Sequence, residues 1–251
     1  MNSIAIIPAR YQSSRFPGKP LVDIHGKSMI QRTYEQALKA SLLSKVFVAT
    51  DDKRIYDHVK NFGGNVVITS DQHPSGSDRC NEALQIIQKE ITAVKYDVVI
   101  NVQGDEPYIK PEQIDVLAAC FKNTETQIAT LVKRINSTQD LFSASIAKVL
   151  LNKNKEAICF SRQAIPHIRQ IAENDWLNHF AFYKHIGIYG YRTAVLKKIT
   201  QLPTSAIENA EALEQMRWIE NGYKIKVVET EFDSKAVDTP DDLKKLLTIK
   251  E

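Results

Sequence analysis

A cation-rich loop follows the first hydrophobic run of the chain. Residues 6–20 read IIPARYQSSRFPGKP, and Gly18 in this loop would let the backbone approach an oxygen atom closely. The side chains that can donate hydrogen bonds to an anion are Arg10, Ser13, Ser14, Arg15 and Lys19. Because phosphate oxygens are bound best by charged donors and hydroxyls close together, the loop predicts a polyphosphate site.

The loop differs from the familiar nucleotide-binding signatures. Pro20, and not Ser or Thr, follows Gly18-Lys19, and the glycine that a Walker loop has five residues earlier is missing. No spaced glycines of the Rossmann type follow the hydrophobic run either. Taken alone, these residues are equally compatible with a solvated basic surface loop.

A carboxylate stands at the end of a second apolar run. Residues 101–107 read NVQGDEP, so that Asp105 follows a glycine and Gln103 lies two positions before it. In an open parallel sheet, ligands bind at the carboxyl ends of strands. One or two carboxylates beside a triphosphate suit Mg²⁺, and the Gln103 amide suits a base or sugar edge. The alternative is an Asp that bonds to its own turn.

A second strand-end carboxylate, Asp238, lies in the segment AVDTP at residues 236–240. It is compatible with a residue that merely flanks a helix cap and favours the helix dipole. Two acidic strand ends together with a cationic phosphate loop, however, predict one triphosphate and Mg²⁺ site. Nucleotidyl transfer requires that combination.

The elements that must position these residues alternate along the first half of the chain. Short runs rich in β-branched residues predict buried strands at 4–7, 46–49, 66–68 and 98–102. Helical spacing separates them; one helix begins with a capping box of Ser28 and Gln31, and another begins at Pro111. Alternating strands and helices predict an α/β fold with an open, mostly parallel, doubly wound sheet.

The second half has a looser order. Strand-like runs occur at 128–132, 147–151, 158–160 and 186–191, which indicates mixed sheet. One helix is predicted from the Ser205–Glu208 capping box through Leu213 and Met216 to Gly222, then a strand at 225–228 and a helix capped by Thr239. We expect a single domain over residues 1–251, with a small insertion at about 125–195.

Composition narrows the class of protein. The 251 residues carry a formal net charge of only +3, which argues against nucleic-acid binding. Cys80, Cys120 and Cys159 are widely spaced in apolar contexts and predict reduced core thiols. The apolar run that ends at Ile7 is too short for a signal peptide or a membrane span. We therefore expect a cytoplasmic protein without membrane insertion.

Taken in order, these segments resemble the 3-deoxy-manno-octulosonate cytidylyltransferase (CMP-Kdo synthetase) family. The resemblance extends over essentially the whole chain. It is carried by residues 8–21, 49–52, 73–79, 101–107, 160–162 with 165–166, 185–192, 213–217 and 237–240. The family implies a nucleotidyltransferase fold and transfer of CMP from CTP to the eight-carbon acid sugar Kdo, with release of pyrophosphate. CMP-Kdo supplies lipopolysaccharide biosynthesis.

The resemblance also implies roles for individual residues. Those expected at CTP are Arg10, Ser14, Arg15, Lys19, Ser77, Arg79 and Gln103. Those expected at the sugar are Gln103, Arg162 (near the carboxylate), His185, Tyr189, Glu214 and Gln215. Asp105 and Asp238 would hold Mg²⁺, and Lys19 and Arg10 would neutralise the charge that grows on the phosphate oxygens. Since no dedicated base is evident, we expect the metal to lower the pKa of the attacking hydroxyl.

Several alternatives stay open from the residues alone. His185 and Tyr189 are compatible with satisfied core side chains, and Glu214 and Gln215 with a solvated helix face. Ser77 stands where the family often has Thr, a change that keeps the chemistry. The acceptor could be the 8-amino analogue of Kdo or, with less support, another acid sugar such as sialic acid.

Two other classes of protein fit the residues less well. A glycosyltransferase that uses a nucleotide sugar shares the sheet but typically has an Asp-x-Asp pair, which Asp105-Glu106-Pro107 lacks. A nucleotide-binding module without catalysis would have no use for clustered Lys19, Asp105 and Asp238. The family also implies a homodimer, which we expect to form through residues 125–190, where apolar residues include Trp176, Phe180 and Phe182.

Overall fold

One half of the fold is a parallel sheet. The structure, a computed structural model, describes residues 1–13, 16–90, 94–233 and 236–248. Strands β1 (Ser3–Ala9), β4 (Lys45–Thr50), β5 (Val66–Ile68) and β6 (Val98–Asn101) lie in the order β6-β1-β4-β5, all parallel. They confirm the four strands predicted from the apolar runs.

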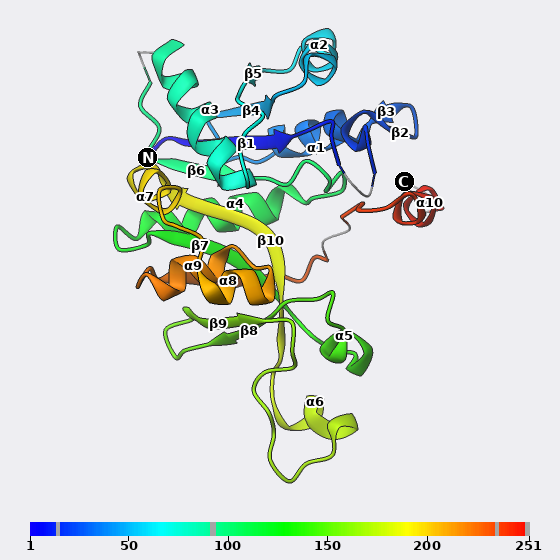
Figure 1. Ribbon diagram of the computed structural model, residues 1–251, viewed down its shortest axis with the longest axis vertical. Helices are drawn as coiled ribbons and strands as arrows, with labels where there is room; N and C mark the ends of the chain where they lie inside the picture. Colours follow the sequence, from blue (N-terminus) through cyan, green and yellow to red (C-terminus); the bar gives the residue numbers. More distant parts are fainter. Residues whose placement is uncertain (14–15, 91–93, 234–235, 249–251) are drawn as a thin grey trace.

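Helices cover both faces of this sheet (Figure 1). They are α1 (Met29–Leu38), α2 (Lys53–Asn61), α3 (Gly76–Glu90) and α4 (Pro111–Ala119). Successive strand residues point to opposite faces, so Ile4 and Ile6 pack with α3 while Ala5 and Ile7 pack with the other helices. Burial on both faces explains why these strands read as unbroken apolar runs.

The start of α1 corrects one prediction. Ser28 caps the helix by accepting a hydrogen bond from the Gln31 backbone N–H (3.2 Å). The Gln31 side chain, however, donates to Glu35 Oε1 (2.9 Å) and not back to the cap. The second half of the predicted capping box was therefore wrong, because an acceptor one turn later lies within reach of the same amide.

The sheet continues through three further strands. They are β7 (Ile128–Arg134), β10 (Tyr183–Arg192) and β11 (Ile225–Glu229), and the described strands of the main sheet lie in the order β11-β7-β10-β6-β1-β4-β5. β10 is antiparallel to both neighbours, whereas β11 is parallel to β7. The prediction of an open, mostly parallel α/β sheet is confirmed, with β10 as the antiparallel member.

Strand β10 changes partners along its length. Tyr183 and Lys184 pair with β8 (Lys148–Leu151), whereas Tyr189 to Arg192 pair with β6. The register shifts between Ile186 and Tyr189, where the strand bends past the end of β6. β8 forms a hairpin with β9 (Ala157–Ser161). One strand thus belongs to the main sheet and to the hairpin.

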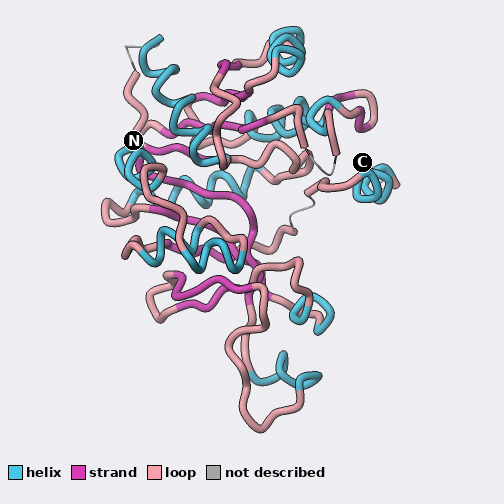
Figure 2. Tube along the Cα trace, in the orientation of Figure 1, coloured by secondary structure: helices cyan, strands magenta, loops and turns pink. Residues whose placement is uncertain are grey.

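Residues 135–182 leave the main sheet and form an arm (Figures 1 and 2). The arm contains α5 (Thr138–Phe142), the β8–β9 hairpin, the short 3₁₀ turn Glu173–Asp175 and α6 (Trp176–His179). The expected boundaries of about 125 and 195 also enclose β7 and β10, which belong to the main sheet. Trp176 and Phe182 lie in a small core of the arm itself, and Phe180 is 41% exposed.

The C-terminal part corrects a second prediction. Instead of one helix from Ser205 to Gly222, α8 (Ala206–Glu211) and α9 (Gln215–Glu220) are separated at Ala212, which is left-handed (φ 51°, ψ 49°). The Ser205–Glu208 capping box is confirmed, and Gly222 (φ 79°) follows α9 directly. The apolar spacing alone could not reveal the break, because Ala is a strong helix former.

The remaining elements are short and lie around the sheet. They are the 3₁₀ turns Lys19–Leu21 and Cys120–Lys122, the ribbon β2 (Asp23–Ile24) and β3 (Lys27–Ser28), α7 (Thr193–Ile199) and α10 (Pro240–Leu247). The predicted cap at Thr239 is confirmed, with Asp242 completing its box. None of the helices in the described ranges has the length and hydropathy needed to cross a bilayer.

Candidate active site

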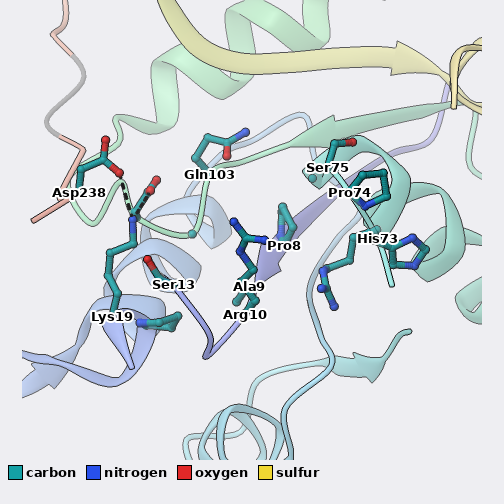
Figure 3. Close-up of a pocket in the computed structure, with 15 residues that line it drawn as sticks. Pro8, Ala9, Arg10, Ser13, Lys19, His73, Pro74, Ser75, Gln103 and Asp238 are labelled. Carbon is teal, nitrogen blue, oxygen red and sulfur yellow. Dashed lines mark hydrogen bonds and ion pairs between the residues drawn. The ribbon is translucent and has the colours of Figure 1, made fainter. Parts of the chain in front are cut away.

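A cavity of about 240 Å³ opens at the carboxyl ends of β1 and β6 (Figure 3). Its walls come from the loop after β1, the start of α3, the loop after β6 and the segment before α10. Of the predicted residues, those that line it are Arg10, Ser13, Lys19, Arg79, Gln103, Asp105 and Asp238. The topology brings them together because parallel strands end at the same edge.

Lys19 lies between the two predicted metal ligands. Its Nζ is 2.6 Å from Asp105 Oδ2 and 3.4 Å from Asp238 Oδ1, and its side chain is 14% exposed. Figure 3 shows the ammonium pointing at both carboxylates. The three groups converge although up to 219 residues separate them in the chain.

Local backbone features place these three side chains. Gly18 is left-handed (φ 73°), and its N–H donates to Tyr11 O (2.9 Å), which closes the loop just before Lys19. Val237 N–H donates to Asp105 O (3.0 Å) and so holds the two acidic segments together. A Cβ on Gly104 would lie 2.8 Å from Pro8 O, so only glycine permits this approach of the β1 and β6 ends.

The other predicted nucleotide residues differ in their surroundings. Arg10 is exposed at the mouth of the cavity. Arg79 is buried; its Nη1 donates to Thr69 Oγ1 (2.7 Å) and pairs with Asp51 (3.1 Å). Ser14 and Arg15 lie outside the described residues.

Ser77 leads from the cavity wall to Glu214. The Glu214 carboxylate accepts hydrogen bonds from the Ser77 hydroxyl and from Arg217 Nη2 (3.1 Å), and it lies 3.0 Å from Ser75 Oγ, whose single proton it shares with Asp78 Oδ2 (2.6 Å). Ser75 itself lines the cavity. Burial raises the pKa of Glu214, although the two hydroxyls and Arg217 oppose that shift. Glu214 therefore lies behind the wall and supports it.

His185 and Tyr189 lie on β10, the strand that passes beside Gln103. Thr130 Oγ1 donates to Ile188 O (2.7 Å), so its oxygen must accept from His185 Nε2 (2.9 Å). This assigns a neutral His185 with the proton on Nε2, in agreement with burial, which lowers its pKa to about 3. The His185 and Tyr189 rings are 5.1 Å apart between centroids.

The bulge of β10 brings this strand against the loop after β6. A Cβ on Gly187 would lie 3.9 Å from the Gln103 side chain and 3.8 Å from Glu106 Oε1. Nearby, the buried polar atoms Asn101 Oδ1, Tyr189 Oη and Gln215 Nε2 have no hydrogen-bond partner within the part of the chain that the structure describes. Buried polar groups are normally paired, so these atoms are candidates to bind a polar ligand.

Arg162 lies elsewhere, on the arm side of α8. Its guanidinium donates to main-chain carbonyls: Nε to Glu211 O (2.7 Å), Nη1 to Ala144 O (3.1 Å) and Ser145 O (3.4 Å), and Nη2 to Ala212 O (3.4 Å). Sequence reasoning did not single out Ser75, Thr130 or Glu211. Ser75 at least falls within the segment 73–79 that carries the resemblance.

The acidic pair suits a hard cation. Within the described ranges, no group of three or more His, Cys, Asp or Glu side chains is arranged to hold a metal ion unaided. Asp105 and Asp238 nevertheless both lie within ion-pair distance of the Lys19 ammonium, so that the two carboxylates face the same point. Mg²⁺ commonly takes one or two carboxylates and completes its shell with water and substrate phosphates. The donor set thus fits a metal that arrives with a triphosphate.

The chain was compared with known families and structures. A family model described as Cytidylyltransferase matches residues 4–225. The chain belongs to the cytidylyltransferase family.

Among cytidylyltransferases, the 3-deoxy-manno-octulosonate cytidylyltransferase of Parabacteroides distasonis is 57% identical over 98% of this chain and 97% of its own length. The enzyme of the same name from Cytophaga hutchinsonii is 52% identical over 96% of this chain and 94% of its own. A solved CMP:2-keto-3-deoxy-manno-octonic acid synthetase complexed with CTP superposes with a TM-score of 0.89 and 40% identity, covering 99% of this chain and 98% of that one.

Proposed function

We propose that this protein is a 3-deoxy-manno-octulosonate cytidylyltransferase, which converts CTP and Kdo to CMP-Kdo and pyrophosphate for lipopolysaccharide biosynthesis. The proposal rests above all on the cavity in which Lys19 reaches both Asp105 and Asp238. A triphosphate brings several negative charges, and this cavity offers cations together with carboxylates for a divalent ion. The similarity to named Kdo cytidylyltransferases supplies the choice of CTP and Kdo.

The reaction needs positioning and charge neutralisation more than covalent chemistry. The anomeric hydroxyl of the sugar attacks the α-phosphorus of CTP in line, and the bond from that phosphorus to pyrophosphate breaks. Lys19 and Arg10 at the cavity would neutralise charge on the phosphate oxygens, while Arg79, held by Asp51 and Thr69, is fixed in advance. Ser77 would act through the wall that it shares with Ser75.

Asp105 and Asp238 would hold Mg²⁺. An ion held by these two carboxylates would supply positive charge against the triphosphate and would favour ionisation of the attacking hydroxyl. On the sugar side, the neutral His185 retains an acceptor nitrogen, and Tyr189 Oη and Gln215 Nε2 lack partners within the described chain. These groups suit a polyhydroxylated acid, with Gln103 between sugar and nucleotide and Glu214 behind Ser75.

The same proposal includes a homodimer. Its support is the arm, which projects from the body of the molecule and leaves Phe142 and Phe180 exposed (40% and 41%) while Trp176 and Phe182 form the arm's own core. Sedimentation equilibrium at micromolar concentration would give twice the 28.4 kDa chain mass if the proposal holds. A monomeric mass would refute the dimer without touching the enzyme assignment.

The function is tested by pyrophosphate release. Purified protein with Mg²⁺ is assayed with each of the four nucleoside triphosphates and with Kdo, 8-amino-Kdo or N-acetylneuraminate. Release with CTP and Kdo supports the proposal. Release with CTP and only one of the other sugars would keep the chemistry and correct the acceptor, and no release with any pair would refute it.

A further inference from the structure

Arg162 and its partners form a joint between the arm and the α8–α9 turn. Three segments meet there: the loop at residues 143–146, the end of β9, and the end of α8. The family resemblance implies that Arg162 lies near the sugar carboxylate. Instead, every hydrogen bond that the structure gives its side chain goes to a main-chain carbonyl.

The α8 end needs these bonds. The last carbonyls of a helix lack partners within the helix, and Arg162 Nε and Nη2 donate to the carbonyls of Glu211 and Ala212. The Glu211 carboxylate in turn accepts from Ser161 Oγ (2.7 Å) and from Arg162 N–H (2.9 Å). Arg162 and Glu211 therefore hold each other through two hydrogen bonds. The Arg162 guanidinium donates to the Glu211 main-chain carbonyl, and the Arg162 backbone N–H donates to the Glu211 carboxylate.

A second cation fixes the other side of the joint. Lys148 is fully buried, and its ammonium donates to Ser143 O (2.8 Å), Ile146 O (2.7 Å) and Arg162 O. A buried ammonium is tolerated only when its donors are satisfied, so the carbonyls of this loop and of Arg162 are fixed around it. Lys148 thus fixes the main chain from which the Arg162 side chain extends.

The joint determines where Glu214 lies. Ala212 is left-handed, a conformation unfavourable for a residue with a Cβ, and the chain turns there to start α9 with Glu214 two residues later. Glu214 then accepts a hydrogen bond from Ser77 and lies 3.0 Å from the hydroxyl of Ser75, which lines the cavity. Arg162 is thus connected to the cavity wall through the α8–α9 turn and Glu214.

We propose that Arg162 is a positioning residue that holds the α8–α9 turn, and through it Glu214 and Gln215, behind the cavity wall at Ser75 and Ser77. For its catalytic consequence the inference rests on the proposed function. It assigns the guanidinium to main-chain carbonyls and not to the substrate carboxylate.

The first experiment needs no substrate. Hydrogen–deuterium exchange followed by mass spectrometry compares the wild type with Arg162→Ala, Glu211→Gln and Arg169→Ala, the last an exposed arginine on the same arm. Arg162→Ala and Glu211→Gln should speed exchange in residues 206–220, since removing the joint lowers the free energy of opening of that turn. Arg169→Ala should not. Unchanged exchange in 206–220 for Arg162→Ala would overturn the proposal whatever the enzyme assay gives.

The second experiment separates positioning from direct contact. The affinity for Kdo and for its carboxamide, as KM or as a competitive inhibition constant, is measured for each variant, together with the KM for CTP. Arg162→Ala should lower the affinity for Kdo and for its carboxamide by the same factor, on the order of tenfold, because a displaced wall misplaces either ligand. Arg162→Lys should behave like Arg162→Ala, since an ammonium cannot reproduce the fork.

Loss confined to the acid would mean that the guanidinium pairs with the substrate carboxylate and would overturn the proposal. Glu211→Gln added to Arg162→Ala should cause little further loss, because both changes open one joint. The wild-type assay with CTP and Kdo runs in parallel, so failure of the proposed function is seen separately from failure of the joint.

Discussion

The cavity edge and the α8–α9 turn are built in contrasting ways. At the cavity edge, each charged residue follows a buried strand or stands before a capped helix, and the parallel topology brings Lys19, Asp105 and Asp238 together. At the turn, the shape depends on bonds from a distant side chain, Arg162, to main-chain carbonyls. The first kind of site can be recognised from sequence pattern, whereas the second depends on tertiary contacts that no local pattern announces.

The largest effect should come from the cavity edge. Lys19→Ala should lower kcat/KM on the order of a thousandfold, because it removes a cation from a site where charge grows in the transition state and leaves Asp105 and Asp238 without it. Steady-state pyrophosphate release measures this. Lys27→Ala, which breaks an exposed pair with Glu35, is the control and should be near wild type. Equal activity of both variants would contradict the assignment.

Asp105→Asn should follow, with a loss of about a hundredfold in turnover. The amide keeps the size of the side chain but loses the charge that Lys19, and a divalent ion, would need. Turnover is titrated with Mg²⁺, and we expect the midpoint to move to higher concentration. Asp57→Asn, at an exposed pair with Lys53, is the matched control. Unchanged turnover for Asp105→Asn would remove the carboxylate from the mechanism.

On the sugar side, the expected effect is on stability. Burial lowers the pKa of His185 to about 3 in the folded protein, below its ordinary value of 6.5. Between those values the unfolded chain binds a proton that the folded chain does not, so stability falls as the pH falls through this window. Since His185 is only partly buried by surface area, we expect a loss of about 1 kcal/mol between pH 7 and pH 5.

Urea unfolding at the two pH values, for the wild type and for His185→Asn, measures that difference. Between pH 7 and pH 5, the variant should lose less unfolding free energy than the wild type, because the contribution of His185 is missing. Its stability should therefore depend less on pH. An identical pH dependence in both proteins would show that His185 is not held neutral by its contacts with Thr130 and the surrounding rings.

The smallest effect concerns the turn itself. Ala212→Gly should raise the free energy of unfolding by roughly 0.5 kcal/mol, because glycine removes the left-handed penalty but also makes the unfolded chain more flexible. Ala210→Gly, two residues earlier in α8, should destabilise by about 0.5–1 kcal/mol. Chemical denaturation compares them, and equal signs would mean that Ala212 does not bear the strain assigned to it.

Much of the fold could be predicted because its signals are local. The runs at 4–7, 46–49, 66–68 and 98–102 are buried on both faces, which apolar continuity reveals. The cap at Thr239 and the box at Ser205–Glu208 were recognised for the same reason. The break at Ala212 was not, since helix propensity opposes it and the bonds that impose it come from Arg162, 50 residues away.

The candidate site shows the same division. The residues predicted around the triphosphate converge on one cavity, apart from Ser77 behind its wall and Ser14 and Arg15 outside the described residues. Residues that act through others were missed. Thr130 fixes the tautomer of His185 and Ser75 connects Glu214 to the cavity, yet a lone hydroxyl in a strand or loop carries no signal of that kind.

Strand β10 connects the two regions, since it pairs with β8 at one end and with β6 at the other. The register of β10 therefore places side chains both at the substrate edge and at the base of the arm. Adding or deleting a residue within β10 would turn the side chains on one side of the change to the opposite face of the sheet. Changes of length between residues 162 and 182 leave the register of β10 unchanged. The arm can diverge in length among relatives, or be lengthened by design, while the residue count of β10 stays fixed.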